Sequence, residues 1–225
     1  MLILFGFLGA VAFAAHNAGK YYQVDMILFH PQHIKALETE ANPRPLLLHQ
    51  PTAQLGSEDQ QKAHFQNLLV LPLLSRNLQH NQIADQRIQN SNNYQLIGHY
   101  SWRQHIGSKQ NIIYFNTAEL MTSNNPDTEL GNNAQTSEQQ AVNIEGHLHF
   151  SRLRFIHLKA HLLIKVRAAA IVANAAKDEH EEQADSTSTV DHWTSMVQTR
   201  RMRSNQLHYI DHPTVGMLIS LTPLS

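Results

Sequence analysis

The side chains best suited to chemistry in this 225-residue chain are concentrated near its C-terminus, in the stretch RRMRSNQLHYIDHP. Guanidinium groups are planar and bind carboxylates through two parallel hydrogen bonds, so a run of arginines favours a ligand that carries carboxylates. We interpret the stretch as a strand, a turn and a second strand that present cations at a ligand-facing edge. The residues predicted to contact a ligand here are Arg200, Arg201, Arg203, His208, Tyr209, Asp211 and His212.

Aromatic residues on another predicted strand extend this ligand surface. In the segment YQLIGHYSW, the residues Tyr94, Leu96, Tyr100 and Trp102 share one parity and therefore one strand face. Tyr100 and Trp102 could stack on sugar rings, with Arg103 beside them. Arginine and aromatic groups together suit a ligand made of sugars and peptide carboxylates. The ordinary alternative is that Trp102 lies in the core and the arginines line a solvated strand.

A second group of side chains suits a metal ion. Glu145, His147 and His149 alternate along one predicted strand, so they share a face on which two imidazoles can chelate a single ion. No HExxH motif accompanies them, and a polar outer face of an antiparallel strand explains the same pattern. We therefore predict no metal and no other cofactor, and keep this group as the weaker alternative.

Catalysis has little support in the sequence. The chain contains neither a GxSxG nor an SxxK motif. Asp211 and His212 are adjacent, and adjacent residues of an extended segment point to opposite faces, so they are poorly placed to act as a pair. The absence of cysteine also excludes thiol nucleophiles, thiolate ligands and disulfides. We predict that the protein is not an enzyme.

The N-terminus is typical of an exported protein. Residues 2–15 form an apolar run that is shorter than the roughly 20 residues needed to span a bilayer as a helix, and small residues follow at Ala12-Phe13-Ala14. No Lys or Arg precedes the run. We interpret residues 1–15 as a signal peptide, whose cleavage leaves a periplasmic protein without a membrane span. The formal net charge of −1 gives no support to a nucleic-acid partner.

Alternating apolar residues predict strands along most of the remaining chain. The predicted strands are residues 21–30, 94–102, 111–121, 142–167, 191–203 and 215–221. Segments 94–102 and 111–121 flank Gly107 and are predicted to pair as a β-hairpin. Within 142–167 the apolar positions change parity, which indicates either one bulged strand or two strands joined by a tight bend.

Helical and polar segments complete the predicted organisation. A helix is predicted from Pro72 to about Asn90, because proline suits a first helical turn and apolar residues recur at helical spacing. Residues 122–141 and 177–189 are predicted to be polar loops. The pattern predicts an α+β fold with a mostly antiparallel sheet and one or two helices near the N-terminal half. No linker or repeat divides residues 16–225, so we expect a single domain.

Four segments resemble the CsiV family of periplasmic peptidoglycan-binding proteins: YYQVDMILFHP, SWRQHI, IEGHLHFSRLRFIHLKAHLLI and RRMRSNQLHYIDHPTVGMLISLTP. The last is the most specific, while residues 31–92 carry little of the resemblance. It implies a soluble, non-enzymatic protein that binds peptidoglycan. It also implies that the protein supports wall synthesis by a class A penicillin-binding protein, together with that synthase's outer-membrane lipoprotein activator. It assigns no binding residues. A His-rich periplasmic metal-binding protein and a wall-active hydrolase remain alternatives.

Overall fold

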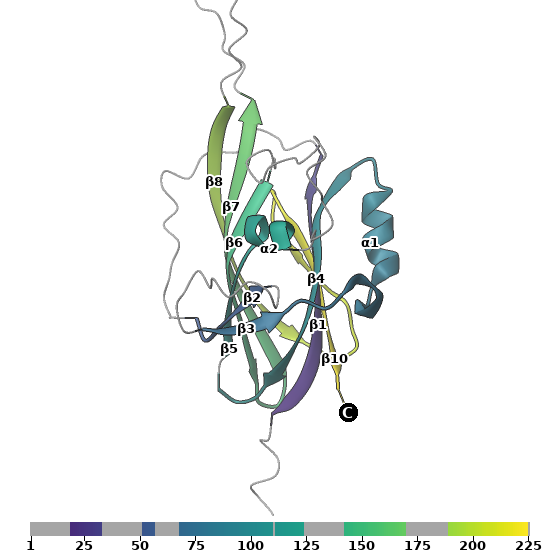
Figure 1. Ribbon diagram of the computed structural model, residues 1–225, viewed down its shortest axis with the longest axis vertical. Coiled ribbons are helices and arrows are strands. Elements are labelled where there is room, and N and C mark those ends of the chain that lie inside the picture. The colour runs from purple at the N-terminus through teal and green to yellow at the C-terminus, as the bar shows by residue number, and fades with distance from the viewer. Residues whose placement is uncertain are drawn as a thin grey trace, which may run out of the picture.

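The computed structural model, drawn in Figure 1, describes residues 19–32, 51–56, 68–109, 111–123, 142–169 and 189–224. In this part of the chain, strands dominate and form two sheets. The predicted signal peptide lies outside the described residues, as do nearly all of the two predicted polar loops. No helix in the described part is long and apolar enough to cross a membrane.

Two sheets of unequal size make up the fold. The four-stranded sheet is antiparallel throughout and has the order β4 (Tyr94–Ile106), β1 (Lys20–Pro31), β10 (Gly216–Pro223), β9 (His208–Asp211). The six-stranded sheet has the order β3 (Leu69–Pro72), β2 (Ala53–Gly56), β5 (Asn111–Asn116), β6 (Val142–Arg152), β7 (Ile156–Ala169), β8 (Thr189–Met202). Among the described strands, the parallel pairings are those of β2 with β3 and of β2 with β5. The prediction of a mostly antiparallel sheet is therefore confirmed.

The two sheets bury one shared hydrophobic core. Alternate residues of each strand point into it, as strand geometry requires. Trp102 and Ile219 enter from the four-stranded sheet, whereas Phe115, Phe150 and Leu158 enter from the six-stranded sheet, and all five are fully buried. Because burying a large apolar side chain contributes about 2 kcal/mol, this core holds the two sheets together.

A short helix covers the outer face of the four-stranded sheet (Figure 1). α1 (Gln82–Gln89) follows Asn81, which adopts the left-handed conformation at φ 59°. Its Ile88 packs on Ile27 and Phe29 of β1, which point away from the main core. Both faces of β1 are thus buried, which explains why its apolar residues do not alternate strictly with polar ones. The helix α2 (Thr117–Ser123) directly follows β5.

A buried carboxylate fixes the segment before α1 to the same outer face. Asp25 is fully buried, accepts a hydrogen bond from the Ser101 hydroxyl, and accepts another from the backbone N–H of His80 at 2.8 Å. The His80 ring also lies close, with Nδ1 3.3 Å from the Asp25 carboxylate. Leu74 donates its N–H to the Ser101 carbonyl at 2.7 Å, which covers the edge of β4. The groove described below is built on this anchored segment.

The predicted hairpin of residues 94–102 and 111–121 is wrong. β4 pairs with β1 in one sheet, and β5 pairs with β6 and β2 in the other. The turn at Gly107 therefore carries the chain from one sheet to the other. Sequence alternation identifies the strands but not their partners, because strands in opposite layers show the same apolar pattern.

Two other predictions have mixed outcomes. The helix does not start at Pro72, which is the last residue of β3; α1 begins at Gln82 after a short 3₁₀ turn. The change of parity within residues 142–167 marks two strands, β6 and β7, joined by a tight bend at residues 153–155. Of the two interpretations of that pattern, the tight bend is confirmed.

Candidate functional site

Cationic side chains gather at the end of the fold where β1 begins, at the bottom of Figure 1. Lys20 is opposite Ile106, Gly107 accepts a hydrogen bond from the Arg152 N–H at 2.7 Å, and Arg201 is opposite His157 just beyond the bend. We define the basic end as Lys20, Arg103, Lys109, Arg152, Arg154, Arg200, Arg201 and Arg203. Within the described chain, none of these cations is paired with a carboxylate, so this end can attract anionic groups.

Phe155 organises the arginines of this end. The guanidinium carbon of Arg201 lies 4.6 Å from the centre of the Phe155 ring, and that of Arg154 lies 5.5 Å from it. A guanidinium held against an aromatic ring is oriented by the cation–π attraction, while its N–H groups remain open to a ligand. The sequence analysis missed Phe155 and Arg154 as site residues. Both residues lie in an exposed bend between two buried strands, and this position is the signal from which the sequence could have identified them as surface residues.

The three predicted arginines are exposed but do not form one row. Arg201 points to the outer face of the six-stranded sheet, as its partner His157 does, and Arg200 points to the opposite face. Arg203 lies beyond β8, which ends at Met202. The group therefore surrounds the end of the strand and presents cations in several directions.

Tyr100 and Trp102, predicted to stack on sugar rings, are not accessible at the surface. Both are buried between the sheets, where the Trp102 Nε1 donates a hydrogen bond to Gln104 Oε1 at 2.8 Å. Burial raises the pKa of Tyr100 well above its ordinary value. A register shift between β1 and β4 places Tyr94 on the outer face and Tyr100 on the inner face. Arg103, on the outer face, is exposed as predicted.

The residues after the arginines divide between turn and surface. His208 Nε2 accepts the Arg203 N–H at 3.1 Å, and His212 Nδ1 accepts the Thr214 N–H at 3.3 Å, so both imidazoles stabilise turns. Tyr209 and Asp211 point to the outer face of the four-stranded sheet, opposite Leu218 and Gly216. The predicted cluster is thus split, because β9 is a separate strand that belongs to the other sheet from β8.

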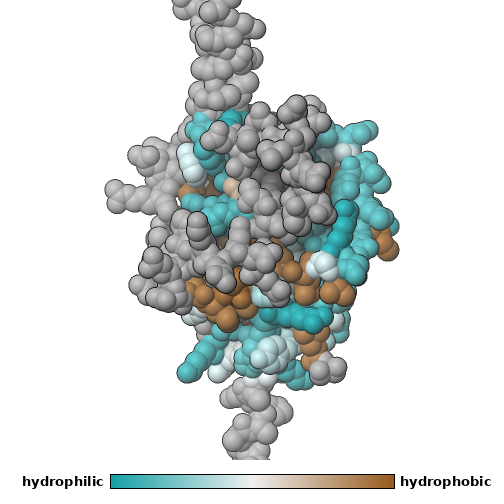
Figure 2. Space-filling view, viewed as in Figure 1, coloured by the Kyte–Doolittle hydropathy of each residue, from teal (hydrophilic) through white to brown (hydrophobic). Residues whose placement is uncertain are grey.

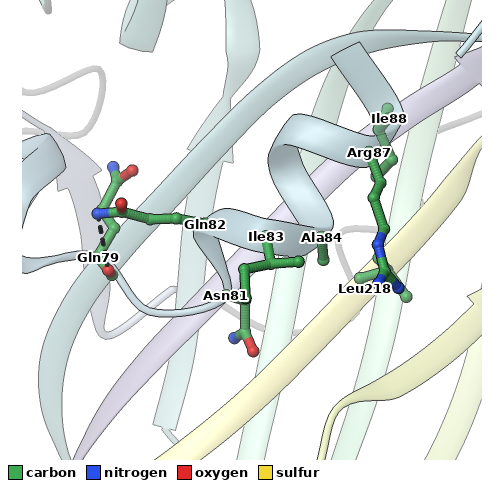
Figure 3. Close-up of a pocket in the computed structure, with 8 residues that line it drawn as sticks. All are labelled: Gln79, Asn81, Gln82, Ile83, Ala84, Arg87, Ile88 and Leu218. Atoms are coloured by element: carbon green, nitrogen blue, oxygen red, sulfur yellow. Dashed lines mark hydrogen bonds between the residues drawn. The ribbon is translucent and has the colours of Figure 1, made fainter. Parts of the chain in front are cut away.

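A groove on that outer face is lined in part by Leu218, the residue paired with Tyr209 (Figure 3). It has a volume of about 750 Å³ and lies between α1 and β10. Its walls include Asn81, Ile83, Arg87 and Ile88 from the helix region and Leu218 from β10. In Figure 2 the side of the molecule that carries α1 is mainly hydrophilic, with one small apolar spot. Sequence reasoning missed the groove, since no local pattern predicts which helix lies on which sheet.

The predicted metal-binding group lies on the outer face of the six-stranded sheet. His147 is opposite Tyr114 and His161, and the rings of His149 and His161 are stacked with centroids 5.1 Å apart. Burial, and secondarily electrostatic repulsion from the neighbouring His161, lowers the pKa of His147. Glu145 shares the face, as predicted, and Asn116 donates a hydrogen bond to it at 3.5 Å. Among the residues that the structure describes, no three His, Asp or Glu side chains are placed to hold a metal ion.

Comparison with known proteins agrees with the resemblance seen in the four segments. A family model described as "Peptidoglycan-binding protein, CsiV" matches residues 1–224. Neither the curated proteins nor the solved structures gave a match. Because the family model covers nearly the whole chain, including the arginine-rich β8 and the outer-face strand β9, the protein belongs to the CsiV family of peptidoglycan-binding proteins.

Proposed function

We propose that this protein binds peptidoglycan through its basic end and leaves the polymer chemically unchanged. Peptidoglycan combines glycan strands with short peptides that carry carboxylates. The observation that supports the proposal most strongly is the set of exposed arginines around Phe155 that have no carboxylate partner within the described chain. Planar guanidinium groups match carboxylates geometrically as well as in charge.

Several organisational features belong to the same proposal. Residues 16–225 act as one domain in the periplasm after the signal peptide is removed. The core shared by both sheets supports the single domain, because its residues come from strands along the whole described chain, from β1 to β10. The protein supports wall synthesis by a class A penicillin-binding protein together with that enzyme's outer-membrane lipoprotein activator. This last part rests on the family resemblance alone.

Co-sedimentation with purified sacculi tests the proposal. The chain without residues 1–15 is incubated with sacculi, which are then pelleted. The protein is expected in the pellet, and the supernatant is expected to contain no released muropeptides. Release of soluble fragments by the pure protein would show a hydrolase and overturn the non-enzymatic part of the proposal. Protein that stays in the supernatant would overturn the binding part.

A further inference from the structure

Tyr209 is fixed as an exposed aromatic platform on the outer face of the four-stranded sheet. Its ring lies alongside that of Phe29, with planes 14° apart and centroids 6.2 Å apart. Its hydroxyl donates a hydrogen bond to Asp211 Oδ1 at 2.6 Å. Tyr209 as a whole nevertheless remains 46% exposed. Both the tilt of the ring and the direction of its hydroxyl are therefore set before any ligand binds.

Phe29 can support this platform because the neighbouring strand offers it a glycine. A Cβ atom at Gly216 would lie 2.4 Å from the Phe29 ring, so any larger residue would push the ring away from the sheet. Tyr94 contacts the Phe29 ring edge-on at 5.3 Å and is itself exposed. Three aromatic rings therefore form one contiguous surface, with Tyr209 and Tyr94 reaching solvent.

The groove beside α1 continues this surface. Leu218 lines the groove and lies directly opposite Tyr209 in the pairing of β10 with β9. Ile88 also lines it and packs in the same cluster as Phe29. In Figure 3 the side chain of Arg87 extends along the groove toward Leu218. Within the described chain Arg87 has no carboxylate partner.

The surface combines apolar and polar groups on a scale that suits a sugar ring. A pyranose presents a face of C–H bonds, which packs on an aromatic ring, and a rim of hydroxyls, which need hydrogen-bond partners. Tyr209, Leu218 and Ile83 supply the apolar part. Asp211 supplies an acceptor beside the platform, and Asn81 and Arg87 supply donors in the groove. The Asp211 carboxylate disfavours an anionic peptide at the platform, so a neutral ring fits better there than a stem peptide.

We propose that Tyr209 and the groove beside α1 bind the sugar rings of a glycan strand, as a site separate from the basic end. The inference rests on the proposed function, since it divides peptidoglycan between two surfaces of the protein. Carboxylates of the peptides are bound at the basic end, and sugars are bound at the outer face of the four-stranded sheet. Arg203 and His208 form a short connection between the two surfaces, because the His208 ring is hydrogen-bonded to the Arg203 backbone.

Neutral oligomers of N-acetylglucosamine are the probe that separates the two sites, because they present sugar rings and carry no carboxylate. The chain without residues 1–15 is expected to bind them, and Tyr209→Ala is expected to weaken this binding about tenfold, which corresponds to loss of one good aromatic contact. Tyr209→Phe keeps the ring and is expected to bind within about threefold of the original protein. Tyr21→Ala is the matched control, because Tyr21 is 61% exposed at the other end of the same sheet face.

Each outcome decides the inference. Binding to intact sacculi without binding to the N-acetylglucosamine oligomers would overturn the sugar site and leave the proposed function standing. Failure to bind intact sacculi would overturn the proposed function itself. Unchanged oligomer binding by Tyr209→Ala, with an unaltered melting temperature, would show that sugars bind elsewhere. If Tyr209→Ala and Tyr21→Ala lose the same amount of sugar binding, Tyr209 is not a specific binding platform.

Discussion

The guanidinium carbon of Arg201 lies 4.6 Å from the centre of the Phe155 ring. The contact joins the end of β8 to the bend between β6 and β7. It also places a planar donor group at the edge of an aromatic surface, where the cation stays accessible and loses little freedom when a carboxylate binds. The predictions about binding follow from this pair.

Arg201→Lys is expected to weaken sacculus binding although it preserves the charge. Lysine cannot form the two parallel hydrogen bonds of a guanidinium and stacks poorly on Phe155. A loss of about threefold to tenfold is expected, the range of one charge-assisted hydrogen bond. The measurement is the dissociation constant for sacculi, with Arg167→Lys as the control because Arg167 is paired with Asp191 away from the basic end. Equal binding by Arg201→Lys and the original protein would mean that only charge matters at this position.

Asp25→Ala is expected to destabilise the fold by about 3 kcal/mol, the scale of a broken buried polar network. The change leaves the buried Ser101 hydroxyl and the His80 N–H without their acceptor. Urea unfolding measures the free energy. The control is Asp191→Ala, which removes a surface ion pair with Lys165 and should cost less than about 1 kcal/mol. If both variants unfold at the same urea concentration, the Asp25 network does not anchor the segment before α1.

Gly146→Ala is expected to be among the most destabilising single-methyl substitutions in the chain. A Cβ atom there would lie 2.2 Å from the His161 carbonyl oxygen, which belongs to the backbone of β7 and cannot move aside cheaply. A loss of at least about 2 kcal/mol is expected. Gly107→Ala is the comparison, because a Cβ atom at Gly107 would lie 3.3 Å from its nearest neighbour, the His105 side chain. Similar melting temperatures for the two variants would show that β6 and β7 can separate locally.

Stability is expected to fall as the pH drops below neutral, partly through His99. Burial lowers the pKa of His99, although Asp85 and Asp25 partly oppose the shift. The folded chain therefore takes up a proton less readily than the unfolded chain, which binds one below about pH 6.5. Stability is present above that value and is lost as the pH falls toward the lowered pKa of the folded state. Melting temperatures between pH 7.5 and 5 for the original protein and for His99→Gln measure this. If the melting temperature of His99→Gln falls by the same amount over this pH range, the loss of stability is caused by other groups.

How much of this structure the sequence predicts depends on the range of the interactions involved. The bend between β6 and β7 could be predicted, because Leu153 and Phe155 interrupt the even-numbered apolar pattern that the residues before and after them follow. The exposure of Arg201 followed from its position near a strand end. The burial of Trp102 did not follow, because the face of β4 that meets the other sheet depends on a register shift against β1, far away in sequence. The Phe155 contact and the groove beside α1 also depend on distant segments, so no local pattern encodes them.

The proposed use of the basic end also predicts a strong salt dependence. The attraction between exposed guanidinium groups and carboxylates is screened when salt rises from about 0.05 M to about 0.5 M, which shortens the Debye length to roughly 4 Å. Sacculus binding is expected to weaken severalfold over this range. Binding of the neutral N-acetylglucosamine oligomers at the Tyr209 surface should change much less, because this ligand carries no charge. Equal salt sensitivity of the two ligands would argue against separate sites.

The most direct test of the central claim compares the chain without residues 1–15 with its Arg201→Ala/Arg203→Ala double variant in a sacculus pull-down at low salt. Melting temperatures establish that both proteins are folded. The proposed function predicts that the original chain sediments with the sacculi and that the double variant stays largely in the supernatant. If the folded double variant sediments as well as the original chain, the basic end is not the surface that binds peptidoglycan.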